Sequence, residues 1–342
     1  MLRMKPCRGC PPRPPRTAFV VGLSLFGLLP SIAPCQITPD QIQQVRSALN
    51  SRIEALTILG GDFGLSDGSF SSVTPNPLAP RQGNDTAMEV NKFGGAADVG
   101  DPRPLGGLPI SWQPRLQGNM GYLESTDYLH GAPLDGYVST FKDYAIQFGG
   151  GARFWLSGHF SVAPTLMGMY GHTSNAYAAN SLFMWSNLPL ATQLGLVDWS
   201  VDTWTLRPAL DFQYVFTWKR SIVTLSSDPT YFHTESFRSS NAAVSLNGNS
   251  GSLDTKIDLD VPLDRELFGH ELHAGGYLSR TDLFGELKTG LDAQHINEIH
   301  GRLVLDYLNQ LWKFKWIGVG GSYLWGPNFR GWTVGADIAY HF

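Results

Sequence analysis

The feature that most constrains this chain is a strict alternation of apolar and polar side chains over unusually long segments. Segment 204–218 is apolar at every even position, and segments 144–156, 253–263 and 332–342 alternate in a similar way. A period of two places successive side chains on opposite faces of a β-strand. These runs span 11–15 residues, against about 5–6 for typical strands, and a transmembrane strand needs about 9–11. The pattern therefore predicts an all-β fold, a transmembrane antiparallel β-barrel.

The composition agrees with a surface that faces lipid. Only 16% of the residues are charged, against roughly 25% in soluble domains, while 12% are aromatic. Aromatic residues also end the apolar faces, as Trp204 and Trp218 do in one segment, which is typical of the girdles at the two membrane interfaces. The mean hydropathy of −0.11 disfavours a helical membrane protein.

Twelve segments have strand character, and the connections between them alternate between long and short, with exceptions at 99–109 and 326–330. Short periplasmic turns and longer extracellular loops produce such an alternation, and bacterial barrels have an even number of strands. The predicted strands are 60–69, 86–98, 110–123, 141–156, 160–171, 199–217, 221–237, 253–263, 270–281, 295–308, 312–325 and 331–342.

The N-terminus has the composition of a secretory signal peptide. Five basic residues precede an apolar core at 19–32 that Pro30 interrupts, and this core is too short to anchor in a membrane. We predict three parts: residues 1–35 are the signal peptide, 36–59 an amphipathic helix with its linker, and 60–342 the barrel. Such export predicts the outer membrane of a Gram-negative bacterium as the location.

Removal of the signal peptide changes the chemistry of the chain. Cys7, Cys10 and Cys35 all lie in residues 1–35, so we expect an exported chain that is stabilised without disulfides. The net charge falls from −4 to −9 because five basic residues are lost, and this disfavours a nucleic-acid partner. No cofactor is expected.

Residues 38–58 predict one amphipathic helix. Thr38 suits the N-cap, Pro39 the first helical position, and Gln41 completes a capping box. The apolar stripe from Ile42 to Leu56 needs a surface to cover it, because isolated helices are marginal. Three placements stay open: on a periplasmic partner, on the inner leaflet of the outer membrane, or in the barrel lumen. For the lumen, the expected apolar contacts are Val215, Ile317 and Val319.

The last residues match the closing strand of an outer-membrane barrel. Gly335, Ile338, Tyr340 and Phe342 lead to a terminal aromatic residue. We predict that these four residues are the signal that the outer-membrane barrel assembly machinery reads. The expected partners are therefore this machinery, periplasmic chaperones and outer-membrane lipids.

Charged side chains at inward positions are the candidate site residues. They could line a selective pore, or they could form a paired polar network that fills the lumen and makes the barrel rigid; we favour the network. Gly149, Gly150 and Gly151 would permit curvature or the close approach of a plug. The lumen-lining candidates are Arg153, Arg207, Asp211, Arg302, Asp306, Lys315 and Asp337.

The sequence offers no clear catalytic constellation. The segment 270–273 (HELH) lacks the spacing of a zinc-binding HExxH motif, and His295 and Glu298 fall on opposite faces of a strand. Asp228 and His233 could be a hydrolase pair or ordinary loop polarity. We therefore predict no catalytic residues, no metal and no enzymatic activity.

Several stretches resemble the solitary outer-membrane autotransporter barrels, which lack a passenger. The resemblance rests on the twelve predicted strands, the N-terminal helix and the stretches 148–156, 163–172, 204–210 and 228–233, and it covers about residues 60–342. It implies an outer-membrane translocator fold, and it implies fold and location better than an activity.

These observations together predict a translocator-type or structural barrel. A passive, porin-like channel for small solutes is the alternative, and an outer-membrane hydrolase is a third, less favoured interpretation.

Overall fold

The structure is a computed structural model, and it describes residues 39–61, 65–74, 84–129, 137–178, 192–193, 195, 197–306 and 314–340. The predicted signal peptide and Phe342 lie outside the described residues, and the side chains of Lys315, Asp337, Ile338 and Tyr340 are not described either. Among the described helices, none is long and apolar enough to cross a membrane.

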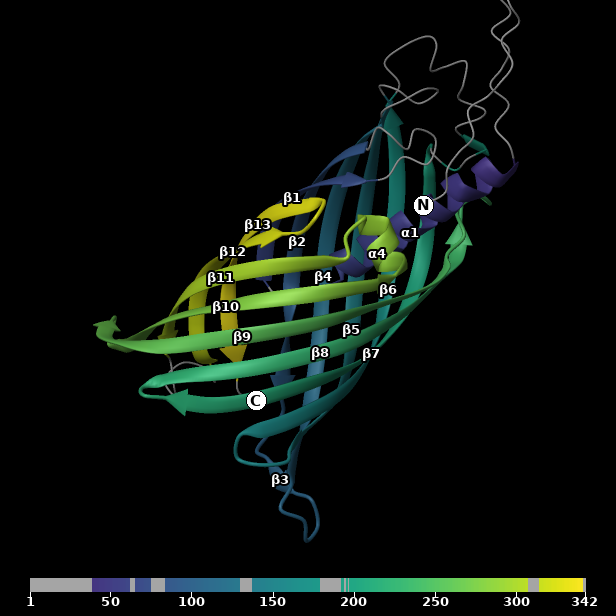
Figure 1. Ribbon diagram of the computed structural model, residues 1–342. Coiled ribbons are helices and arrows are strands. Elements are labelled where there is room, and N and C mark those ends of the chain that lie inside the picture. Colours follow the sequence, from purple (N-terminus) through teal and green to yellow (C-terminus); the bar gives the residue numbers. More distant parts are fainter. Residues whose placement is uncertain are drawn as a thin grey trace, which may run out of the picture. The chain divides into compact units, whose positions relative to one another are not determined.

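Twelve long antiparallel strands close into a barrel (Figure 1). Strand β1 pairs with β13 and with β2, and β2 pairs with β4, which closes the ring. The two-residue strand β3 (Arg103–Pro104) lies in the β2–β4 connection. The prediction of a twelve-stranded barrel is confirmed. The long strands are β1 (Leu65–Thr74), β2 (Asn84–Asp98), β4 (Ser111–Leu129), β5 (Tyr137–Trp155), β6 (Phe160–Ala178), β7 (Trp199–Trp218), β8 (Ser221–Ser239), β9 (Asn247–Leu267), β10 (His270–Gly285), β11 (His295–Asp306), β12 (Phe314–Trp325) and β13 (Phe329–Tyr340).

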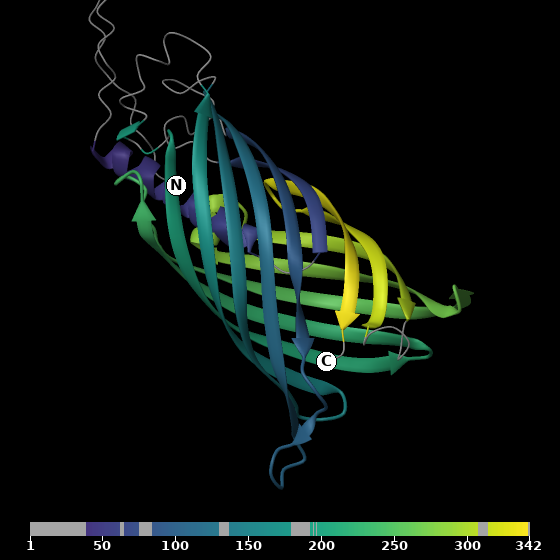
Figure 2. The ribbon, with the colours of Figure 1, turned by 180° about the vertical axis from the view of Figure 1, so that it is seen from behind.

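The two ends of the barrel differ in their connections. Tight turns at 156–159, 219–220 and 268–269 lie at one end, which we call the turn end. The longer connections, such as 240–246 and 286–294, lie at the opposite end, the loop end (Figures 1 and 2). The alternation of connection lengths along the sequence therefore corresponds to the two ends of one barrel.

Several strands extend further toward the loop end than the sequence predicts. β5 begins at Tyr137 instead of 141, β6 ends at Ala178 instead of 171, and β9 begins at Asn247 instead of 253. Beyond the apolar band both faces of these strands carry polar residues, so the alternation disappears although the hydrogen-bonded ladder continues. The alternation of apolar and polar residues therefore reveals only the membrane-embedded part of a strand, and not its extension beyond the membrane.

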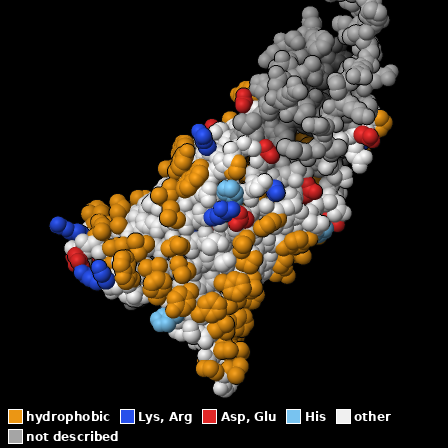
Figure 3. Space-filling view, in the orientation of Figure 1, with side chains coloured by type: hydrophobic (Ala, Val, Ile, Leu, Met, Phe, Trp, Pro, Cys, Tyr) orange, Lys and Arg blue, Asp and Glu red, His pale blue; other side chains and the backbone are white. Residues whose placement is uncertain are grey.

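The outer face of the barrel is apolar. Exposed side chains such as Phe148, Trp218 and Val319, which are 68%, 60% and 63% exposed, point outward from the strands. Figure 3 shows hydrophobic side chains spread over the visible face of the barrel. Ile317 and Val319 were predicted as inward contacts of the helix, and both predictions are wrong, because the inward positions of β12 are the even ones that include Ser322 and Leu324.

Helix α1 (Pro39–Gly60) lies inside the barrel, and the short helix α4 (Glu286–Leu291) in the β10–β11 connection packs against it (Figure 1). Every residue from 51 to 58 is buried. Of the three placements that the sequence left open, the structure therefore shows the lumen. The predicted strands leave a connection at 282–294, and in the structure β10 continues to Gly285 and α4 follows it.

The two ends of the barrel predict different accessibility on cells. Ser240 at the loop end and Lys219 at the turn end are both exposed, and we expect Ser240→Cys to react with a membrane-impermeant maleimide on intact cells. Lys219→Cys should react only after the outer membrane is permeabilised, because the longer loops of such barrels are extracellular. The opposite pattern would invert the topology.

Candidate functional site: the plugged lumen

Helix α1 enters the lumen from the loop end. Near its start, Arg46 Nη2 donates to the carbonyl oxygen of Gln193 at 2.9 Å, and Asn50 Nδ2 donates to that of Ser245 at 2.9 Å, and both acceptors lie in loop-end connections. At its other end Gly60 lies against β4, where a Cβ on Gly121 would sit 1.9 Å from the Gly60 carbonyl oxygen. The helix therefore runs from the loop end toward the middle of the barrel.

The apolar stripe of α1 is covered on two sides. Leu49, Ile53 and Leu56 belong to a buried cluster with strand residues. Ala55 and Ile58 belong to a second cluster, which contains residues of α4. Each fully buried aliphatic side chain contributes about 1.5–3 kcal/mol, so these contacts hold the helix in place. The strand and loop partners in the first cluster are Met88, Val90, Leu123, Phe141, Trp199, Val201, Val244, Leu246 and Phe329.

A buried ion pair ties α1 to β4. Arg52 Nη2 lies 3.2 Å from Asp127 Oδ1 and donates to Ser125 Oγ at 2.9 Å, while Thr86 donates to the same carboxylate oxygen at 2.8 Å. Both charged side chains are less than a tenth exposed. A buried charge is costly unless it is paired, so Arg52 fixes the position of the helix along the lumen.

A second polar contact ties the end of α1 to β5 and β6. The hydroxyls of Thr57 and Thr173 both donate to Asp143 Oδ1, at 3.2 and 2.5 Å. Asp143 is fully buried, and a Cβ on Gly60 would lie 2.6 Å from its other oxygen. Gly60 is therefore required for the close approach of helix and strand.

A third contact joins α1, α4 and β9. Ser250 Oγ donates to Glu54 Oε1 at 2.6 Å and accepts from the backbone N–H of Leu287, and Ser51 pairs with Glu286. The pKa of Glu54 on α1 is raised to about 7, chiefly by burial and also by the nearby Glu286 carboxylate, while the hydrogen bond from Ser250 and the nearby His233 oppose the shift. Glu54 is therefore partly protonated at neutral pH.

Helix α4 closes the lumen over α1 at the loop end. Leu287 and Leu291 are buried, and a Cβ on Gly290 would lie 2.2 Å from the Ser51 carbonyl oxygen. The helix ends at Asp292, which has φ of 48° and accepts a hydrogen bond from Asn328 Nδ2 at 2.7 Å. Gly290 therefore permits a close contact between α4 and α1, because any side chain at this position would push the two helices apart.

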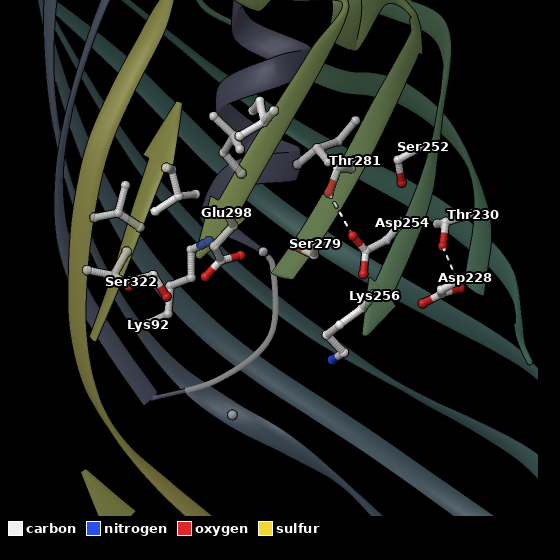
Figure 4. Close-up of a pocket in the computed structure, with 18 of the residues that line it drawn as sticks. Lys92, Asp228, Thr230, Ser252, Asp254, Lys256, Ser279, Thr281, Glu298 and Ser322 are labelled. Atoms are coloured by element: carbon white, nitrogen blue, oxygen red, sulfur yellow. Dashed lines mark hydrogen bonds between the residues drawn. The ribbon is translucent and has the colours of Figure 1, made fainter. Parts of the chain in front are cut away.

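Below α1 the lumen keeps a cavity of about 670 Å³, whose wall carries both charged and apolar side chains. Four cationic side chains line it, Lys92, Arg115, Arg207 and Lys256, and so do four carboxylates, Asp211, Asp228, Asp254 and Glu298. Figure 4 shows that residues from several strands converge there, with Thr281 hydrogen-bonded to Asp254 and Thr230 to Asp228. The charges of the wall are balanced, which favours no single sign of ion.

Two of the sequence-predicted site residues, Arg153 and Asp211, come together in one network near the turn end. Arg153 lies 3.2 Å from Asp211 and 3.3 Å from Asp98, and it donates to Gln213 at 2.5 Å. Its side chain is 7% exposed. The arrangement is that of a paired polar network.

The other predicted residues lie elsewhere. Arg207 contacts Thr230 at 3.5 Å, and Arg302 makes two hydrogen bonds to Asp258, at 2.7 and 2.8 Å. The backbone carbonyl oxygen of Asp306 accepts a hydrogen bond from His270 Nδ1 at 3.2 Å. These groups line the wall as separate pairs rather than as one site.

The residues considered as possible catalytic groups do not come together in one site. Asp228 contacts Arg207 at 3.9 Å on the inner face, whereas His233 bonds Asn249 and Glu235, so the two do not share a site. His300 bonds Ser322. Within the described residues, no group of three or more His, Cys, Asp or Glu side chains could hold a metal ion.

The polar residues of α1 are not among the site residues that the sequence predicts. Arg52, Glu54 and Thr57 recur on faces of the helix outside the apolar stripe, and this was the available signal. Their partners Asp127, Asp143 and Ser250 are 75, 86 and 196 residues away along the chain, so the contacts depend on the closed barrel.

The fold and the lumenal helix define an autotransporter-type outer-membrane β-barrel domain. The chain belongs to the family of solitary outer membrane autotransporter β-barrel domains, whose family model matches residues 109–335, about two thirds of the chain. No curated protein matches the sequence.

Two of the solved structures that match this chain illustrate the shared fold. The β-domain of the Bordetella autotransporter BrkA is 15% identical with a TM-score of 0.50, covering 81% of this chain and 98% of that one. The transport unit of the autotransporter AIDA-I from Escherichia coli is 9% identical with a TM-score of 0.56, covering 86% and 99%. At such identities the likeness concerns the fold alone.

We expect Arg52→Met to loosen α1 strongly, because Asp127 then remains buried without its cation. The loss should be about 3–5 kcal/mol, measured as faster hydrogen exchange of the α1 amides in the refolded barrel. Arg46→Met is the control, since it removes one contact at the mouth and should cost about 1 kcal/mol. Equal protection in both variants would contradict a role for the buried pair.

The raised pKa of Glu54 predicts a pH dependence of docking. Between its ordinary value of 4.5 and about 7 the docked helix holds the proton more tightly than the released helix, so docking weakens as pH rises and is weakest above pH 7. The full effect is about 3 kcal/mol. Hydrogen exchange at pH 5 and pH 8 should show this difference, and Glu54→Gln should abolish it. Glu89 is exposed, so Glu89→Gln is the control and should retain the difference in exchange between the two pH values. If Glu54→Gln kept the same difference, Glu54 would not be the group responsible.

Proposed function

We propose that this chain is a translocator-type outer-membrane barrel that acts without a passenger and whose own N-terminal helix plugs the lumen. The observation that carries the proposal is the direction of α1, whose start contacts loop-end connections while its end reaches the middle of the barrel. A segment that passes through the lumen from the turn end to the loop end leaves a helix in this orientation.

The polar contacts of α1 support a stably closed lumen. Arg52, Glu54 and Thr57 contact four strands, β4, β5, β6 and β9, and α4 covers the helix from the loop end. These contacts are distributed around the helix, so it is held on several sides. We propose that the barrel conducts poorly while α1 is docked and that its lumen carries out no catalysis.

A passive channel is the second candidate function. The cavity below α1, with four cations and four carboxylates on its wall, supports it. In this interpretation small solutes of either charge would pass once the helix leaves. The lumen residues Arg153 and Asp211 would then act as a stabilising pair of the wall rather than as a selectivity filter.

We also propose that the barrel contacts outer-membrane lipids, the barrel assembly machinery and periplasmic chaperones. The exposed apolar belt supports lipid contact, and the segment of Gly335, Ile338, Tyr340 and Phe342 is proposed as the signal for the barrel assembly machinery.

Conductance in planar bilayers tests the plug. The full barrel should conduct rarely, and deletion of residues 39–58 should produce a clear and continuous rise in conductance, because α1 fills the lumen above the cavity. An Arg220→Ala variant at the turn end is the control and should behave as the full barrel. An epitope placed before Pro39 should also be detected by antibody on intact cells. Unchanged conductance after the deletion would refute the plug.

A further inference from the structure

A polar cluster lies on the outer surface of the barrel, just past the apolar band on the loop side. On three neighbouring strands, β5, β6 and β7, the last exposed aromatic residues are Tyr144, Tyr170 and Trp204. The next outward positions are Lys142, His172 and Asp202. Interfacial aromatic residues mark the level of the lipid headgroups, so these polar side chains lie at the depth of the headgroups and ester bonds.

A short hydrogen bond orients His172. Its Nδ1 lies 2.6 Å from Asp202 Oδ1, and the carboxylate also accepts from the hydroxyl of Tyr170 at 3.0 Å and lies 3.8 Å from Arg238. The Asp202 side chain is 11% exposed and that of His172 is 39% exposed. A carboxylate on Nδ1 fixes the tautomer of an imidazole and leaves Nε2 as the basic nitrogen.

Ser174 lies two residues beyond His172 on the same outward face of β6. Thr173 and Asn175, on either side of it, are buried inside the barrel. Positions i and i+2 of a strand are about 6.6–6.8 Å apart, so the hydroxyl and the imidazole can turn toward one another. Within the described part of the chain the Ser174 hydroxyl has no hydrogen-bond partner, and catalytic hydrogen bonds often form fully only with substrate.

The neighbours of Ser174 complete the chemistry. Lys142 lies directly opposite Ser174 on β5; its side chain is 45% exposed, and its ammonium lies 3.8 Å from a carboxylate oxygen of Glu124 on β4. Cβ atoms of directly opposite residues are about 4.5–5.5 Å apart, so the ammonium can reach an oxygen bound at Ser174. Toward the turn end, exposed Ile146, Phe148 and Leu166 form an apolar surface along which acyl chains can lie.

We propose that Ser174, His172 and Asp202 form a lipid-facing serine hydrolase site that cleaves acyl esters of glycerophospholipids in the leaflet at the loop end. This proposal goes beyond the translocator function and does not rest on it. Its residues lie on the outer face, whereas the plug occupies the lumen.

The reaction balances with water as the co-substrate. Ser174 Oγ bonds to the ester carbonyl carbon while its proton passes to His172 Nε2, and Lys142 stabilises the negative oxygen that forms. The bond from the carbonyl carbon to the lipid alcohol breaks, and that alcohol takes the proton from His172. Water then attacks the acyl-serine with His172 as base, which releases the fatty acid and restores Ser174. Asp202 holds His172 in place and is a positioning residue.

The test uses the full chain, refolded in detergent, with a fluorophosphonate probe and glycerophospholipid mixed micelles. We expect the probe to label Ser174, as located by peptide mass spectrometry, and fatty acid to be released. Ser174→Ala should lose the label and at least about 10³-fold in rate. The control is Ser200→Ala, because Ser200 lies opposite Ser174 on β7 and is similarly placed; it should keep both signals.

Two further variants separate catalysis from folding. His172→Ala should abolish turnover, and Asp202→Asn should lower the rate and change its pH profile, while the heat-modifiable band on gels shows that each variant is folded. Absence of labelling and of fatty-acid release in the folded full chain would overturn the proposal. So would equal activity in Ser174→Ala.

Discussion

The requirement that every backbone N–H and C=O be paired within the membrane is the constraint on which this structure depends. Lipid offers no hydrogen bonds, so a sheet can cross it only when its edges are joined. The pairings of β1 with β13 and of β2 with β4 close the ring. Closure then divides the side chains by a period of two into a lipid-facing set and a lumenal set, and each set meets a different solvent.

The lumenal set solves the opposite problem, because charges enclosed by a barrel must find partners there. Arg52 and Asp127, and Arg302 with Asp258, are such pairs. Three polar side chains of α1 find partners on four strands, so the helix supplies the charges and hydrogen-bonding groups that these strands need in the lumen. This explains how a helix that is only partly apolar is stable inside a polar lumen, and why its apolar side needs the added cover of α4.

The strands and the lumenal helix were predictable because they repeat over many residues, whereas the sites depend on register. All twelve predicted strands overlap the observed ones, although the first, 60–69, lies about five residues too early, since α1 ends at Gly60 and β1 is Leu65–Thr74. The predicted helix 38–58 ends within two residues of Gly60. The partner of His172 could not be found along the sequence, since Asp202 comes opposite only through the pairing of β6 and β7. Helix α4 was missed because six residues with an internal glycine carry no helical period. Val319 was predicted to face the lumen because it is apolar, but the even-numbered positions of β12 face the lumen and the odd-numbered ones face the lipid.

The same alternation also explains how one short stretch of β6 can serve two surfaces. Thr173 points inward and binds the carboxylate that anchors the end of α1, while His172 and Ser174 on either side of it point to the lipid. A shift of one residue in the register of β6 would exchange the two sets and destroy both arrangements. Substitutions that keep the register, however, act on one face alone. The plug and the outer cluster can therefore change independently although they share a backbone, because the strand holds their side chains on opposite sides of the barrel wall.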